Sequence, residues 1–234
     1  MVGKRLNRLG VTVMALMALF VAVYSLRYCA TLADVWLGVD PRLRDVLTQV
    51  PVRALTHVLV GPIALLLGPT QFFPGLRGKY PQAHRWCGRA YVLACVVAGA
   101  GALATAPFAS GGPIAGLGFA VLAALWIGTT LGAWRAAVRR SFRLHRLLMR
   151  FSYAMTFGAV TLRLQIPIGF ALGYPSYSAM SVWLAYTSWV PNVMVVALHA
   201  IAEQFLHRAT SPAIDRPSVL RNLSRGEAVD GIRN

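Results

Sequence analysis

The feature that most constrains this chain is a series of six apolar segments, each roughly 20 residues long. As an α-helix, a segment of that length extends about 30 Å, which is the thickness of the hydrocarbon core of a bilayer. The segments lack the regular polar positions that an amphipathic soluble helix turns toward water. The sequence therefore predicts an all-α fold, a polytopic bundle of six transmembrane helices.

Short polar or turn-rich connections separate the predicted spans. The spans cover approximately residues 11–37, 51–73, 86–107, 114–134, 147–172 and 180–205. The first connection, 38–48, is polar and predicts a loop or a short surface helix. Gly61 and Gly68 are seven residues apart in the second span, so we expect another helix to approach that face closely. We expect residues 1–207 to form one transmembrane domain and residues 208–234 to form a weakly structured tail.

The distribution of basic residues predicts the orientation of the spans. The net charge of +16 suggests a nucleic-acid-binding protein at first, but the basic residues lie between apolar segments, as the positive-inside rule requires. With a cytoplasmic N-terminus, 18 of the 23 lysines and arginines lie on the cytoplasmic side: three before the first span, four around the start of the third, six around the start of the fifth and five in the tail. Of the others, Arg27 is expected to reach outward to the membrane surface. We predict that both termini lie in the cytoplasm. We predict membrane lipids and no nucleic acid as partners, and the sequence does not identify a protein partner.

Histidines and arginines gather at the predicted cytoplasmic ends of the third and fifth spans, in two copies of the pattern H-R-x-x-x-R. The copies consist of His84, Arg85, Arg89 and His145, Arg146, Arg150. The second span ends on the same side with Gln71. The sixth span adds His199 and Glu203, which are one helical turn apart. Polar groups in or near a bilayer are costly, so these residues form the first candidate site.

The charges of this candidate site predict an anionic ligand. Arginines at positions i and i+4 of a helix repel each other by about 0.2–0.5 kcal/mol. Outside the tail, Glu203 is the only acidic residue on the predicted cytoplasmic side, and one carboxylate cannot neutralise four guanidinium groups. We therefore predict a cytoplasmic-side pocket that binds a lipid or a small anionic ligand. The sequence predicts no catalytic residues, and a non-enzymatic protein is favoured.

Two other functions remain open. A carrier of electrons linked to b-type haem or quinone would use His84, His145 and His199, because histidines on facing helices can ligate haem iron and arginines can meet its propionates. A small-molecule transporter would need a water-filled path from this site to a second polar cluster near the outer side. That cluster consists of His57, Arg163 and Gln165.

The polar strip of the sixth span has further alternatives. His199, Glu203 and His207 lie near one helix face and could form a metal or proton-relay surface, although a polar helix end that reaches water explains them equally simply. No H-E-x-x-H motif of a zinc protease is present. We predict no firm metal site.

Several motifs resemble those of a family of bacterial membrane proteins. They are His57-x-x-x-Gly61-Pro62-x-Ala64, Gly68-Pro69-x-Gln71-Phe72, Leu76-Arg77, Pro81-x-x-His84-Arg85-x-x-Gly88-Arg89-x-Tyr91-Val92, His145-Arg146-x-x-x-Arg150 and Thr161-x-Arg163. The family is catalogued as domain of unknown function 2306, and the resemblance covers about residues 50–205. It implies a multi-span protein of the bacterial inner membrane and supplies no reaction. In a general way, the arrangement is also similar to two-haem transmembrane b-type cytochromes.

Overall fold

A computed structural model describes residues 2–33, 35 and 41–210 of the chain. In this part the chain is helical throughout its regular structure and contains no strand. Six segments are long and apolar enough to cross a membrane: Leu9–Thr31, Pro51–Thr70, Pro81–Phe108, Gly112–Val138, Phe142–Ala171 and Tyr177–Leu206. The prediction of an all-α protein with six spans is confirmed. The predicted tail lies almost entirely outside the described residues, and the direction in which the spans cross the membrane stays a prediction.

The chain forms two compact units, Met1–Val196 and Ala197–Asn234, which are described separately. The elements in order are α1 (Val2–Ser25), η1 (Leu26–Ala33), α2 (Pro41–Gln49), α3 (Pro51–Thr70), α4 (Pro74–Lys79), α5 (Pro81–Thr105), η2 (Ala106–Phe108), α6 (Gly112–Val138), α7 (Phe142–Ala171), α8 (Tyr177–Thr187) and α9 (Val190–Thr210). Proline stands in the first turn of α3, α4 and α5, where its missing N–H costs no hydrogen bond. The polar connection after the first span contains the short helix α2, one of the two predicted possibilities.

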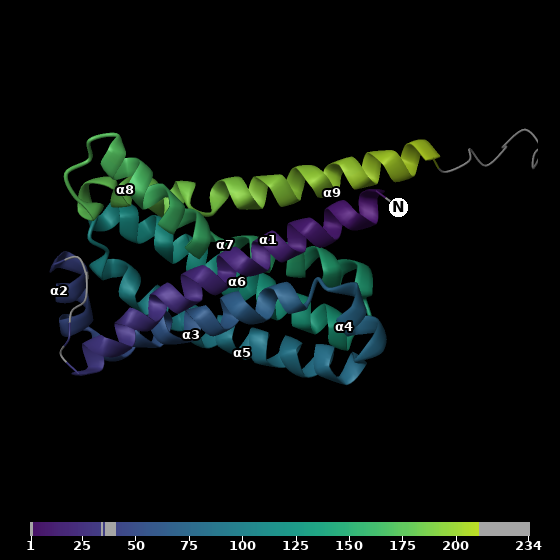
Figure 1. The fold of residues 1–234 in the computed structure, drawn as a ribbon, viewed down its shortest axis with the longest axis horizontal. Coiled ribbons are helices and arrows are strands. Elements are labelled where there is room, and N and C mark those ends of the chain that lie inside the picture. Colours follow the sequence, from purple (N-terminus) through teal and green to yellow (C-terminus); the bar gives the residue numbers. More distant parts are fainter. Residues whose placement is uncertain (1, 34, 36–40, 211–234) are drawn as a thin grey trace, which may run out of the picture. The chain divides into compact units, whose positions relative to one another are not determined.

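In the first unit, α5 packs between α3 and α6, α7 packs on α6, and α1 lies against α3 and α7. The short helix α2 lies at one end of this bundle and α4 lies at the other (Figure 1). We call these the α2 end and the α4 end. Helices α5 and α7 both begin at the α4 end, so the two H-R-x-x-x-R patterns lie at the same end of the bundle.

Small residues permit close packing around α3. A Cβ atom on Gly101 of α5 would lie 2.8 Å from the carbonyl oxygen of Arg53 and 2.9 Å from the backbone nitrogen of His57, so the backbones of α3 and α5 meet here. A Cβ on Gly68 would lie 1.9 Å from the ring of Tyr153. The predicted close approach was wrong at Gly61 for the described residues, because none of their atoms outside the local backbone of α3 lies within 4 Å of a Cβ position. At Gly68 the neighbour is an aromatic ring from α7.

The sixth span is interrupted between α8 and α9, which the sequence analysis did not anticipate. Helix α8 ends at Thr187, and α9 begins at Val190. Pro191 explains the interruption, because proline lacks an N–H and its ring clashes with the carbonyl four residues earlier. That carbonyl belongs to Thr187, which loses its helical partner within an apolar span.

Side chains from α7 and from the start of α9 replace the lost helical hydrogen bonds. Gln165 of α7 donates from Nε2 to the carbonyl oxygen of Thr187 at 3.1 Å and accepts from Thr187 Oγ1 at 3.1 Å. Asn192 donates from Nδ2 to the carbonyl oxygen of Ser188 at 3.2 Å and contacts Thr161 Oγ1 at 2.9 Å. An unpaired carbonyl in hydrocarbon costs several kcal/mol, on the order of 4 or more, so these contacts allow the break to lie in the membrane.

Helices α6 and α7 each end in a hydrogen-bonded turn of the same type. The residue in the left-handed conformation is different in the two turns. At the end of α7, Gly173 has φ 90° and its neighbour Tyr174 donates to the carbonyl oxygen of Gly169 at 3.1 Å. At the end of α6, Arg140 has φ 59° and Ser141 donates to the carbonyl oxygen of Ala136 at 2.8 Å. Glycine adopts this conformation without cost, whereas an L-residue with a Cβ loses roughly 1–2 kcal/mol. Arg140 is therefore a strained residue in the most basic connection.

We predict that Arg140→Gly raises the free energy of unfolding by about 1 kcal/mol, because it relieves this strain. The matched control is Arg139→Gly, which removes the same charge at a residue with φ −78°. The midpoint of thermal unfolding in detergent checks both variants. A midpoint of Arg140→Gly at or below that of Arg139→Gly would contradict the prediction.

Candidate functional site

His84 and His145 lie near each other at the α4 end of the first unit. His145 and Arg77 are the charged groups that act on His84 electrostatically. The Nδ1 atom of His145 lies 2.9 Å from the carbonyl oxygen of Ala133 in α6. Because a carbonyl only accepts hydrogen bonds, Nδ1 carries the proton and Nε2 remains available to a ligand.

The Nδ1 atom of His84 is buried and has no hydrogen-bond partner among the described residues. Buried polar atoms in native proteins are nearly always hydrogen-bonded, and leaving one unpaired costs roughly 1–3 kcal/mol. This atom therefore indicates a missing partner, either a water molecule or a bound group, beside His145 and Arg77.

Gln71 joins these two histidines at the end of α3. A Cβ on Gly88, one helical turn beyond His84, would lie 3.2 Å from Gln71 Oε1. Gln71 Nε2 donates to Thr70 Oγ1 at 3.1 Å. The absence of a side chain on Gly88 thus leaves room for the amide of Gln71 against α5. The structure brings His84, His145 and Gln71 to the same end of the bundle.

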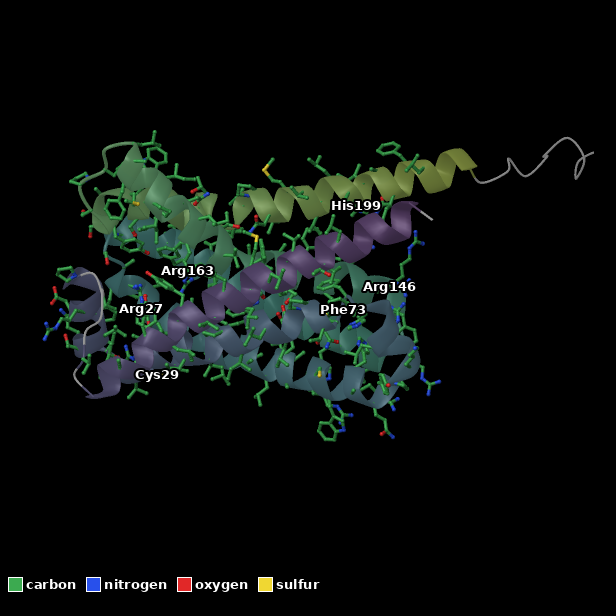
Figure 2. The ribbon with its side chains drawn as sticks, viewed as in Figure 1. Arg27, Cys29, Phe73, Arg146, Arg163 and His199 are labelled. Atoms are coloured by element: carbon green, nitrogen blue, oxygen red, sulfur yellow. The ribbon has the colours of Figure 1, made fainter. Side chains whose placement is uncertain are left out.

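The arginines of the two H-R-x-x-x-R patterns surround this end and point mostly outward. Arg85, Arg89 and Arg146 are exposed, and Figure 2 shows Arg146 at the α4 end. The guanidinium carbon of Arg89 lies 4.9 Å from the ring centroid of Trp86, itself 67% exposed. Arg150 is partly buried and has interactions of its own. Outward arginines near aromatic rings are typical of a membrane surface, where they meet phosphate groups.

His199 and Glu203 form the predicted pair one turn apart on α9. His199 Nδ1 lies 3.5 Å from Glu203 Oε1, and the His199 side chain is 65% exposed. Both residues belong to the second unit, so the approach of His199 to His84 and His145 stays a prediction. The side chain of His207 lies outside the described residues. In the described part of the chain, no group of three or more His, Cys, Asp and Glu side chains could hold a metal ion.

The second predicted cluster lies toward the α2 end, and its members separate into two groups. Arg163 acts electrostatically on His57, whose Nδ1 lies 3.0 Å from the carbonyl oxygen of Ala98. Arg163 donates from Nη2 to Ser25 Oγ of α1 at 3.3 Å. Gln165, in contrast, is engaged by α8 at the break of the sixth span, where both ends of its amide contact Thr187.

Between the two ends, a buried network of hydroxyl groups connects α5, α6 and α7, and the sequence analysis missed it. Tyr91 Oη lies 2.8 Å from Ser152 Oγ and 2.9 Å from Thr156 Oγ1. Trp126 Nε1 donates to Thr156 Oγ1 at 2.8 Å, and Thr130 Oγ1 lies 2.7 Å from Ser152 Oγ. All five side chains are buried. A possible signal was the spacing of Ser152 and Thr156, one turn apart on a span.

The network shows that this level of the core is filled by side chains. Tyr91, Thr130 and Ser152 have no exposed surface, and their hydroxyl groups bond to one another or to backbone carbonyls. A water-filled path from the α4 end to the α2 end therefore does not pass between α5, α6 and α7 in this structure. The water-filled path required of a transporter is absent from this part of the described bundle.

A broad, open cavity of about 810 Å³ lies at the α2 end. Its lining includes Asp45 and Gln49 of α2, Phe108 of η2 and Ser178 of α8. None of the predicted site residues lines it, and its lining combines one carboxylate, one amide, serines, glycines and apolar residues. Nothing in this lining favours a particular ligand.

We predict that Tyr91→Phe lowers the free energy of unfolding by about 1 kcal/mol, because the hydroxyl that joins Ser152 to Thr156 is lost. Hydrogen bonds between transmembrane helices contribute about 0.6 kcal/mol on average. Tyr80→Phe is the matched control, because Tyr80 is exposed. Thermal unfolding of the two variants in one detergent makes the comparison, and equal midpoints would show that the network contributes nothing.

Comparison with known proteins assigns the chain to a family. Residues 54–200 match the family described as predicted membrane proteins. No curated protein and no solved structure matches the chain. The matched residues include most of α3 and all of α5, α6, α7 and α8, together with His57, His84, His145 and Arg163. Because the match covers more than half of the chain, this protein belongs to the membrane-protein family catalogued as domain of unknown function 2306.

Proposed function

We propose that this protein binds an anionic group, either a lipid phosphate or a small anion, at the α4 end of its first unit. One observation carries the proposal: the Nδ1 atom of His84 is buried and has no partner among the described residues. Arg77 and His145, which can carry positive charge, both act electrostatically on His84. An anion there would accept from the unpaired nitrogen and offset the repulsion among its neighbours.

The surrounding side chains support an anion at this position. His145 donates from Nδ1 to the carbonyl oxygen of Ala133, so it can donate to an anion from Nε2 only as the imidazolium. The exposed Arg85, Arg89 and Arg146 supply positive charge around the rim. A hydrogen bond to a charged partner contributes about 1.5–3 kcal/mol, so two or three of them give measurable affinity. That His199 and Glu203 take part in anion binding stays a prediction from the sequence.

The proposed orientation places this site at the cytoplasmic surface of a bacterial inner membrane. His84 and His145 are each the fourth residue of their helix, about 5 Å from its start, which is the depth of lipid phosphates. The concentration of lysines and arginines at the same end favours the cytoplasmic leaflet.

This orientation predicts that both termini face the cytoplasm. Green fluorescent protein fused to either terminus should fluoresce in a bacterial host, because it folds in the cytoplasm. Alkaline phosphatase inserted at Ser110, between α5 and α6, should be active, because it requires the periplasm. Termini on opposite faces would mean an odd number of crossings and would remove the basis for a cytoplasmic anion site.

The proposed site predicts that His84→Ala and His145→Ala each weaken anion binding about tenfold, which corresponds to one charge-assisted hydrogen bond. Binding can be measured in nanodiscs of phosphatidylcholine, by titration with inorganic phosphate and, separately, by incorporation of phosphatidylglycerol. His57→Ala is the matched control, because His57 lies toward the other end of the bundle and bonds to Ala98. His199→Ala tests whether the second unit takes part.

Two results would contradict the proposal. Unchanged binding of both probes by His84→Ala and His145→Ala would show that these histidines do not bind the anion. A Soret band in protein produced with haem available, lost in His145→Ala, would instead identify haem as the occupant. The two results are separable, because anion binding leaves the preparation colourless.

A further inference from the structure

Arg163 of α7 lies in a membrane-spanning helix and toward the α2 end. It is eighteen residues beyond His145, or about 27 Å along the helix, which places it near the far boundary of the hydrocarbon. Its Nη1 donates to the carbonyl oxygen of Ala159 at 2.9 Å, and its Nη2 donates to Ser25 Oγ at 3.3 Å. The hydroxyl of Ser25 is buried and itself donates to the carbonyl oxygen of Val21 at 2.8 Å. Both partners are neutral, so these contacts position the guanidinium without neutralising it.

A second guanidinium, that of Arg27 in η1, lies close to this one. Arg27 donates to Tyr24 Oη and, at 3.1 Å, to Tyr28 Oη. Its guanidinium carbon lies 4.0 Å from the centroid of the Tyr24 ring and 5.0 Å from that of Tyr28. Its Nε atom is buried and has no partner among the described residues. Arg27 is thus held between two tyrosines, and its reach outward to the membrane surface stays a prediction.

Among the described residues, no carboxylate is one of the groups that act most strongly on the charge of Arg163. Figure 2 shows Arg27 and Arg163 at the α2 end, one from η1 and the other from α7. Within the described part of the chain, the groups that act most strongly on this charge are Arg27 and the tyrosines Tyr24, Tyr28 and Tyr177. Two like charges at the edge of hydrocarbon repel strongly, and an anion between them would remove that cost.

We propose that Arg27 and Arg163 form a second anion site, which binds a phosphate group at the side of the membrane opposite the His84–His145 site. A guanidinium has five N–H donors in a planar fork that matches phosphate oxygens. Arg163 uses two donors in the contacts given above, and the Nε of Arg27 is unused. The tyrosines hold Arg27 in place through hydrogen bonds and ring contacts.

The phosphate can belong to a lipid headgroup or to a soluble phosphate. Both sources present the same tetrahedral anion to the two arginines. From the far boundary of the hydrocarbon, the long side chain of an arginine can extend to the lipid phosphates.

The test compares wild type with the double variant Arg27→Gln/Arg163→Gln in two assays. In the first, native mass spectrometry measures phosphatidylglycerol retained after release from nanodiscs of phosphatidylglycerol and phosphatidylcholine. In the second, inorganic phosphate is added to delipidated protein, at constant ionic strength, and thermal unfolding is followed. The control is Arg53→Gln, because Arg53 is an exposed arginine near the same end. We expect the double variant to retain one phosphatidylglycerol fewer than wild type, because the His84–His145 site stays intact, and the control to retain as many as wild type.

The outcomes separate the sources and decide the proposal. Loss of lipid without a phosphate-induced shift in wild type identifies a lipid headgroup, whereas a phosphate-induced shift that only the double variant loses identifies soluble phosphate. Equal behaviour of wild type and the double variant in both assays overturns the proposal. If the double variant fails to fold, Arg27→Lys/Arg163→Lys replaces it, because lysine keeps the charge but lacks the planar fork of donors. This variant should bind phosphate several-fold more weakly than wild type. If the loss of binding caused by the double variant adds to the loss caused by His84→Ala when the substitutions are combined, the two sites are independent.

Discussion

A polar group inside a bilayer needs a partner, because hydrocarbon offers no water to replace a missing hydrogen bond. The described part of this protein follows that rule at each level of the first unit. The imidazoles of His57 and His145 bond to backbone carbonyls of neighbouring helices. The hydroxyl network around Tyr91 is closed among three helices, and the carbonyl freed by Pro191 is taken by Gln165. The few unpaired atoms therefore carry information about ligands.

Among the described residues, three buried side-chain atoms have no partner: His84 Nδ1 at the α4 end, Arg27 Nε at the α2 end and Ser181 Oγ in α8. Around the first two, the neighbouring charges are positive. The core between them is closed by Tyr91, Ser152 and Thr130, so the two ends have no solvent connection through α5, α6 and α7. This arrangement is simpler to reconcile with two separate binding surfaces than with a conducted substrate.

The architecture was predictable because the strongest signals are local. The length of the apolar segments predicted six spans, and the predicted start of the second span at Pro51 is confirmed. The third span was predicted from about residue 86, and its helix begins five residues earlier, at Pro81. The repeated H-R-x-x-x-R pattern predicted His84 and His145 at one end, because both stand at the start of odd-numbered spans, the third and the fifth. The partners within the membrane were not predictable. Single-sequence periodicity does not reveal that Gln165 faces Thr187, that Tyr91 meets Ser152 or that Arg27 approaches Arg163, since each contact depends on how distant helices rotate and pack.

The interrupted sixth span has a consequence for how the protein is made. Its mean hydropathy is 1.3, one of the two lowest among the spans, and the segment carries a carbonyl whose only side-chain partner given by the structure is Gln165. Ribosomes synthesise Gln165 before Thr187, so the amide is already in the membrane when the later segment leaves the insertion machinery. The order of synthesis therefore makes the amide of Gln165 present before the carbonyl group of Thr187 enters the membrane. In a chain with the last segment placed before α7, that carbonyl group would enter the lipid without this hydrogen bond.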